Sequence, residues 1–167
     1  MKKQNSVIHD AVENNDFFKL KNVLTAGEDV NTCGKYERTA LHLAAKTGNT
    51  QIAAYLLSNG ANVNCKNAHG FTPIYVAAIA NNVEVLEKLV NVPTAQIDAV
   101  DVGGMSALIA SSCNGCRDEI ISCLISAGAS GTLRDSIGRC ALDWAREKGF
   151  RSIENLLLLQ QTSSNAA

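Results

Sequence analysis

The sequence predicts an all-α solenoid in which helix–turn–helix units stack side by side and β-turns protrude between them. Three observations indicate this fold: a segment that recurs along the chain, a helix-capping residue at the head of each copy, and a residue suited to ending a helix nine places later. The copies start at residues 6, 39, 72, 106 and 140, which gives spacings of 33, 33, 34 and 34 residues. Repeats of this length are typical of solenoids, because each unit buries its apolar face only against its neighbours.

The first helix of each unit is predicted by three columns of the repeat. Four of the five residues at its head carry a hydroxyl that can accept a backbone N–H bond, and these residues are Ser6, Thr39, Thr72, Ser106 and Cys140. Five places later the residue is small, which lets the next unit approach, and this column reads Ala11, Ala44, Ala77, Ser111 and Ala145. Nine places after the head stand residues that tolerate the left-handed conformation at a helix end, namely Asn15, Gly48, Asn81, Gly115 and Gly149.

A second helix is expected to follow in each unit and to end in a pair of apolar residues such as Leu56 and Leu57. A turn then leads to the next unit. Its Gly, two places before the next capping residue, recurs as Gly70, Gly104 and Gly138. The segment 92–100 departs from this pattern, so we expect a reshaped loop there.

The segments "ERTALHLAAKTGNTQIAAYLLSNGANVN" and "GFTPIYVAAIANN" resemble the ankyrin repeat, whose pattern reads G-x-T-P-L-H-x-A-A-x-x-G with I-x-x-x-L-L-x-x-G-A-x-V-N after it. The resemblance covers residues 6 to about 160 and implies one ankyrin-repeat domain over residues 1–160, followed by a polar tail at 161–167. The units span about 1–33, 34–66, 67–100, 101–134 and 135–160, and the outer two look like caps. In the family the histidine of this pattern bridges loops by hydrogen bonds, so the resemblance implies that role for His42.

Composition argues against several classes of function. Lys and Arg number 15 against 16 Asp and Glu, and this near balance disfavours a partner such as nucleic acid or an anionic membrane. No apolar run approaches the roughly 18 residues of a membrane span, and no signal peptide is recognisable. We therefore expect a cytoplasmic protein, or an effector delivered into a host cytosol, with its six Cys as reduced thiols and with no cofactor.

The only cluster that suggests chemistry is Cys113, Cys116 and Cys123. A zinc site needs four ligands; Cys140, at the head of the next repeat, is the candidate for the fourth, since the three His lie elsewhere. A redox C-x-x-C motif expects a βαβ setting, whereas this chain predicts helices only. We therefore expect no enzyme and no metal; a thiol- or metal-dependent activity at these cysteines is the alternative, as is an accessory subunit of a larger complex.

The resemblance places variable contact positions on a concave face formed by the turn tips and the first helices. At these positions we predict binding of another protein by a monomer, through Lys35, Tyr36, Arg38, Lys46, His69, Phe71, Ile79, Val102, Met105, Asn114, Ile137 and Arg139. An apolar centre beside charged groups is typical of a protein interface, and aromatic and Arg side chains are its usual anchors. Tyr36, Arg38 and Phe71 are therefore the predicted anchors; the alternative is that Phe71 and Met105 pack beneath the turn tips.

Overall fold

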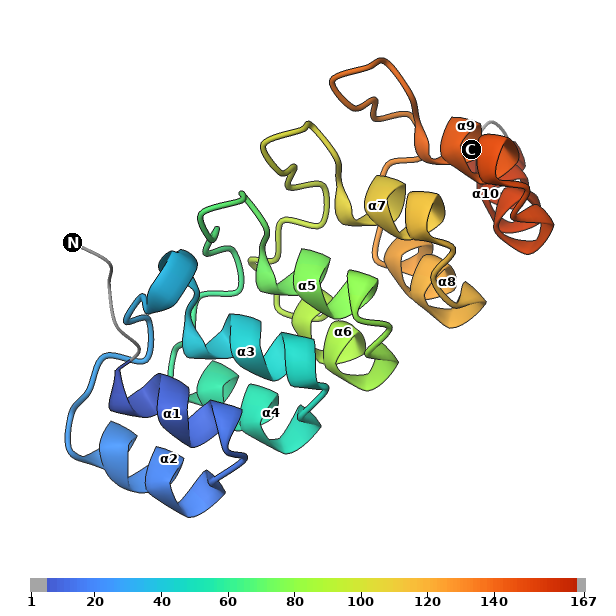
Figure 1. Cartoon of the computed structure of the whole chain (residues 1–167). Coiled ribbons are helices and arrows are strands. Elements are labelled where there is room, and N and C mark those ends of the chain that lie inside the picture. Colours follow the sequence, from blue (N-terminus) through green and yellow to red (C-terminus); the bar gives the residue numbers. More distant parts are fainter. Residues whose placement is uncertain (1–5, 165–167) are drawn as a thin grey trace.

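Each repeat forms two helices joined by a tight turn, and the five pairs stack in chain order (Figure 1). The computed structural model describes residues 6–164, and only the backbone of residues 162–164. The first helices of the pairs are α1 (Val7–Glu13), α3 (Ala40–Thr47), α5 (Pro73–Ile79), α7 (Ala107–Asn114) and α9 (Ala141–Lys148). The second helices are α2 (Phe17–Thr25), α4 (Thr50–Ser58), α6 (Val83–Val90), α8 (Asp118–Ser126) and α10 (Arg151–Ser164), and a short 3₁₀ helix, η1, covers Lys35–Glu37.

The capping column begins the odd-numbered helices, as predicted. The Thr72 hydroxyl accepts the backbone N–H of Tyr75 at 3.2 Å. Cys140 carries no hydroxyl, and there the Asp143 carboxylate accepts the Cys140 backbone N–H at 3.0 Å. Both arrangements satisfy backbone donors that a helix start leaves without a partner inside the helix.

The residues that were expected to end the first helices adopt left-handed backbone conformations. Their φ angles are 54° at Asn15, 74° at Gly48, 58° at Asn81, 64° at Gly115 and 75° at Gly149. The turn glycine Gly70 does the same with φ of 80°, and a Cβ atom added there would lie 3.0 Å from the Cα atom of Asp101. Gly70 therefore meets two requirements, the sign of φ and the close approach of the next turn.

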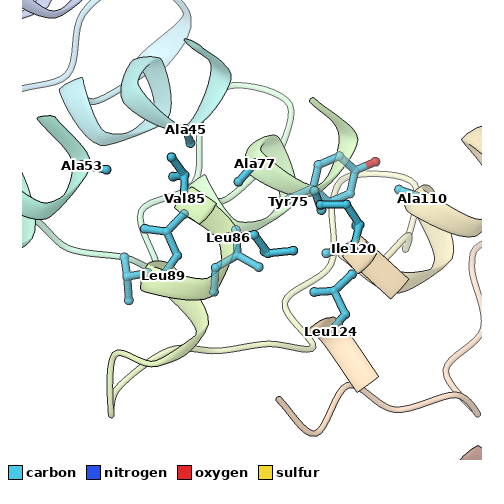
Figure 2. Packing of buried hydrophobic residues seen from close by; sticks show 14 of the residues in the cluster. Ala45, Ala53, Tyr75, Ala77, Val85, Leu86, Leu89, Ala110, Ile120 and Leu124 are labelled. Atoms are coloured by element: carbon cyan, nitrogen blue, oxygen red, sulfur yellow. The ribbon is translucent and has the colours of Figure 1, made fainter. Parts of the chain in front are cut away.

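The column of small residues lies at the contacts between repeats. Each member is fully buried, and the odd-numbered helices pack against one another in chain order. Figure 2 shows apolar side chains of three successive repeats, among them Ala77 of α5 and Leu86 of α6, gathered between the helices. This packing confirms the stacking that the small residues predicted.

Three regions differ from the expectations or refine them. Trp144, in the last repeat, is half-buried and its indole N–H donates to Asp135 at 2.7 Å. The segment 92–100 contains turns and ends in an isolated β-bridge between Val100 and Ser106. Helix α10 runs to Ser164, so the backbone of the predicted polar tail is helical as far as the structure describes it; residues 165–167 and 1–5 lie outside the described residues.

Candidate functional site

The turns project beside the odd-numbered helices, and we call the surface that these two sets of elements share the concave face (Figure 1). Each of the last three turns is built around a side-chain acceptor that the sequence analysis did not single out. Asp101 accepts the backbone N–H of Gly103 at 2.8 Å and that of Met105 at 2.9 Å, and Asn67 and Asp135 do the same in their own turns. An Asn or Asp five places before the capping residue, with Gly three places later, is the signal that could have revealed these turns.

Successive turns are also joined to each other by backbone hydrogen bonds. The N–H groups of one turn donate to carbonyl groups of the turn before it: Ala68 to Tyr36 at 2.9 Å, Val102 to His69 at 3.3 Å and Ser136 to Gly103 at 3.0 Å. The tips therefore form one connected row, and a partner that binds them does not have to order separate loops.

Histidines fasten the first two turns to the helices behind them. The backbone N–H of Thr39 donates to Nδ1 of His42, so the ring proton lies on Nε2, which donates to the carbonyl of Phe71 at 2.9 Å. His9 makes the equivalent bond to the carbonyl of Arg38 at 2.8 Å. The bridging role expected for His42 is confirmed, and burial lowers the pKa of its imidazole to about 4.

Tyr75 takes the place of histidine in the third repeat and reaches the next turn by a different route. Its hydroxyl donates to the second carboxylate oxygen of Asp101 at 3.0 Å. Burial raises the pKa of the Tyr75 hydroxyl, and the neighbouring Asp101 carboxylate raises it further. The hydroxyl therefore stays protonated and holds the third turn to α5.

Several predicted contact residues meet at the first two turns in a row of rings. The ring centroids of Tyr36 and His69 are 6.5 Å apart, those of His69 and Phe71 are 5.6 Å apart, and Phe71 stacks on Tyr75 at 4.3 Å with the planes 6° apart. Two cations lie against the outer ring, because Nζ of Lys35 and Cζ of Arg38 are 5.2 Å and 5.1 Å from the Tyr36 centroid. These contacts are within the range of cation–π attraction.

Beside this row lies a cavity of about 280 Å³ between the first two turns, α3 and α5. Phe71, Val76 and Ile79 give it apolar walls, and Arg38 and Lys46 line it from the preceding repeat. The structure thus brings together Arg38, Lys46, Phe71 and Ile79, which the sequence analysis named as separate contact positions. Val76 was missed, because the helix periodicity alone does not tell whether this side chain faces a cavity.

The remaining predicted residues lie farther along the concave face. Val102 and Ile137 stand at turn tips, with 82% and 64% of their surface exposed. Met105 and Phe71 are half-buried and pack against the core, so the alternative that they lie beneath the tips describes both in part. Asn114 is exposed at the end of α7.

Arg139 is already engaged within its own repeat. Its guanidinium forms an ion pair with Glu147, and its Cζ atom lies 4.6 Å from the centre of the Trp144 ring. Compared with Arg38, it therefore offers less to a partner.

The first turn differs from the others in its backbone. Gly34 stands where the later turns have Asn or Asp, and Tyr36 and Glu37 adopt φ angles of 58° and 57°. Left-handed residues other than Gly cost about 1–3 kcal/mol and persist where their surroundings hold them, often at ligand sites. Here the Gly34 N–H donates to the Arg38 carbonyl at 2.8 Å and closes the turn. The strained turn presents Tyr36 and Arg38 to the concave face.

The cysteines do not form a metal centre in the part of the chain that the structure describes. Among residues 6–164, no group of three or more His, Cys, Asp or Glu side chains is placed to hold a metal ion. Burial raises the pKa of the Cys116 thiol and of the Cys123 thiol, which disfavours the reactive thiolate. Cys140 occupies the N-cap position of α9.

Comparison with known proteins decides the family. A family model described as ankyrin repeats in three copies matches residues 8–101, which is more than half of the chain. The chain belongs to the ankyrin repeat family. Ankyrin repeats generally serve as modules for protein–protein interaction.

Similar proteins come from viruses, bacteria and animals. A putative ankyrin repeat protein of Fowlpox virus (strain NVSL), FPV031, is 40% identical over 100 residues, which cover 57% of this chain and 28% of that protein. The putative ankyrin repeat protein YahD of Escherichia coli (strain K12) is 28% identical over 146 residues, 87% of this chain and 58% of its own length. Mouse Rabankyrin-5 is 31% identical over 113 residues, 60% of this chain and 10% of that protein. The chain therefore spans less than two thirds of each of these relatives.

The helices of the ankyrin repeats are short. In the residues that the structure describes, none is both long enough and apolar enough to cross a bilayer.

Proposed function

We propose that this ankyrin chain is a non-enzymatic binding module that holds a partner protein on its concave face, as an adaptor, an inhibitor or an effector. It acts as a monomer in the cytosol, or in a host cytosol if it is an effector. The six free thiols support a reducing compartment, and the likeness to a poxvirus protein supports the effector alternative.

The observation that carries the proposal is a set of exposed apolar side chains on connected turns. Tyr36, Val102 and Ile137 are 51%, 82% and 64% exposed, although the backbone that carries them is fixed by hydrogen bonds between turns. Water-exposed apolar groups on a rigid surface favour association with another apolar surface. Burying them costs little ordering entropy, because the row is already in place before binding.

The test is affinity capture with three versions of the chain. The bait with both Val102→Asp and Ile137→Asp places two charges at the turn tips. A matched control with Asn22→Asp and Gln51→Glu makes the same change in net charge at exposed positions on α2 and α4. We expect the wild-type and control baits to capture the same protein and the turn variant to lose it. Capture by the turn variant at the wild-type level, with an unchanged melting temperature, would reject the concave face as the binding surface.

A further inference from the structure

The cavity between the first two turns is lined by two cations, at positions where the last repeat carries an ion pair. In the second to fifth repeats, the residue one place before the capping column and the residue seven places after it lie on the concave face. In the last repeat these two are Arg139 and Glu147, which form an ion pair. In the second repeat the same two positions hold Arg38 and Lys46, which both line the cavity. The geometry that gives Arg139 a carboxylate partner therefore places a second cation beside Arg38.

No carboxylate is among the described residues that line this cavity, so those residues do not neutralise its cations. Two like charges on neighbouring positions repel each other, and a carboxylate between them removes that repulsion and adds two attractive contacts. The expected ligand group is thus an Asp or Glu side chain or a terminal carboxylate, in the role that Glu147 has toward Arg139.

The interior of the cavity calls for a different group. Phe71, Val76 and Ile79 are apolar, and the volume of about 280 Å³ lies just below the roughly 300–1,000 Å³ of small-molecule sites. A single large apolar side chain matches this size better than a cofactor or metabolite. The walls are also held firmly, because the Phe71 ring stacks on Tyr75 and the Phe71 carbonyl accepts a hydrogen bond from Nε2 of His42.

We propose that the cavity binds a linear acidic segment of a partner protein, with a large apolar side chain inserted between Phe71 and Ile79 and an adjacent carboxylate held by Arg38 and Lys46. This inference rests on the proposed function and specifies the chemistry of the partner. The peptide continues over the Tyr36 and His69 rings, which extend the apolar surface toward the first turn. An acidic peptide is favoured over a folded apolar surface, because only a narrow segment brings a carboxylate and an apolar group to one cavity.

The test uses a phage library of random 12-residue linear peptides, selected against the wild-type chain. Peptides that are enriched are then synthesised with a fluorescent label, and their affinity is measured by fluorescence anisotropy. We expect them to contain Leu, Ile, Met, Phe or Trp beside Asp or Glu. Their affinity should fall at least fivefold between 50 and 300 mM salt, because charge attraction is screened.

Three variants separate the parts of the proposal. Ala80→Leu fills the cavity, which Ala80 lines, and should weaken binding at least tenfold. Lys46→Gln removes one cation and should weaken it about threefold. Lys46→Glu supplies an internal partner for Arg38 and should weaken it at least tenfold, with the fold preserved because Lys46 is exposed. Replacing the acidic residues of the peptide by Asn and Gln should cost affinity on the wild-type chain and cost little on Lys46→Glu.

The outcomes distinguish this inference from the proposed function. A library that yields no binder, or peptides without acidic residues, would overturn the inference. The inference would also be overturned by peptides whose affinity is unchanged by Ala80→Leu and Lys46→Glu but is lost in the variant with Val102→Asp and Ile137→Asp. The concave face would then stand as a binding surface. Peptides unaffected by any of these changes bind elsewhere on the chain and would overturn the inference, whereas the capture experiment decides the proposed function. A labelled twelve-residue oligothymidine that binds as tightly as the peptides and competes with them would assign the cavity to nucleic acid and overturn the inference as well.

Discussion

Protonation of His42 is expected to weaken the junction between α3 and the second turn. The folded chain keeps the ring neutral, since burial lowers its pKa from 6.5 to about 4, while the unfolded chain binds a proton at the ordinary pKa. Between these values the unfolded state therefore holds more protons, and the free energy of unfolding falls as the pH falls through this window. The two pKa values give a loss of about 2 kcal/mol between pH 7 and pH 5.

Urea unfolding followed by circular dichroism at pH 7 and pH 5 measures this loss. Other ionisable groups also contribute to the pH dependence of stability, so the wild-type chain is compared with His42→Gln. Gln has no titrating ring, and at the third position of a helix it can accept the Thr39 N–H as the His42 ring does. We expect the wild-type chain to lose about 2 kcal/mol more than the variant between the two pH values. Equal losses in the two proteins would refute the reasoning, because they would show that the proton on His42 is not linked to folding.

Three further predictions concern the repeat framework. Leu56→Ala removes a fully buried side chain and should lower the free energy of unfolding by about 2–5 kcal/mol; an unchanged urea midpoint would contradict the stacked core. Gly70→Ala should cost more than Gly27→Ala, measured by thermal melting, because both have positive φ, at about 1–2 kcal/mol each, but only Gly70 has the backbone of Asp101 within 3.0 Å. Cys116 should react with an aromatic disulfide at pH 7 more slowly than the thiol of a short unfolded peptide, since burial raises its pKa, and equal rates would restore the case for thiol chemistry.

The framework was predictable because each of its parts depends on residues close together in the chain. A capping residue such as Thr72, a small residue such as Ala77 and a stop such as Asn81 act within one helix, and their recurrence shows which faces meet. The turns were predicted only in part. Gly70 was found, whereas the acceptor Asn67 was overlooked, although it stands three places before that Gly.

The candidate site was predictable as a set of positions and not as an arrangement. The cavity depends on the distance between Arg38 and Ile79, which lie on different repeats, and no local pattern fixes the distance. The first turn was harder still, because Tyr36 and Glu37 adopt a left-handed backbone that the sequence assigns to Gly. Only the contacts of the folded turn hold these two residues there.

The pair of positions that encloses the cavity also gives the concave face a direction. In the second repeat this pair is cationic, Arg38 and Lys46, and in the third it is apolar, Phe71 and Ile79. In the fourth repeat both residues of the pair are half-buried, and in the last the two form an ion pair. Because the repeats have the same backbone plan, this change of side chains is a change of chemistry along one continuous surface. A partner with an acidic group at one end and an apolar stretch after it gains most of its attraction in one orientation and loses it when reversed. The two ends of the stack are therefore not equivalent to a ligand, even though the helices that support them are.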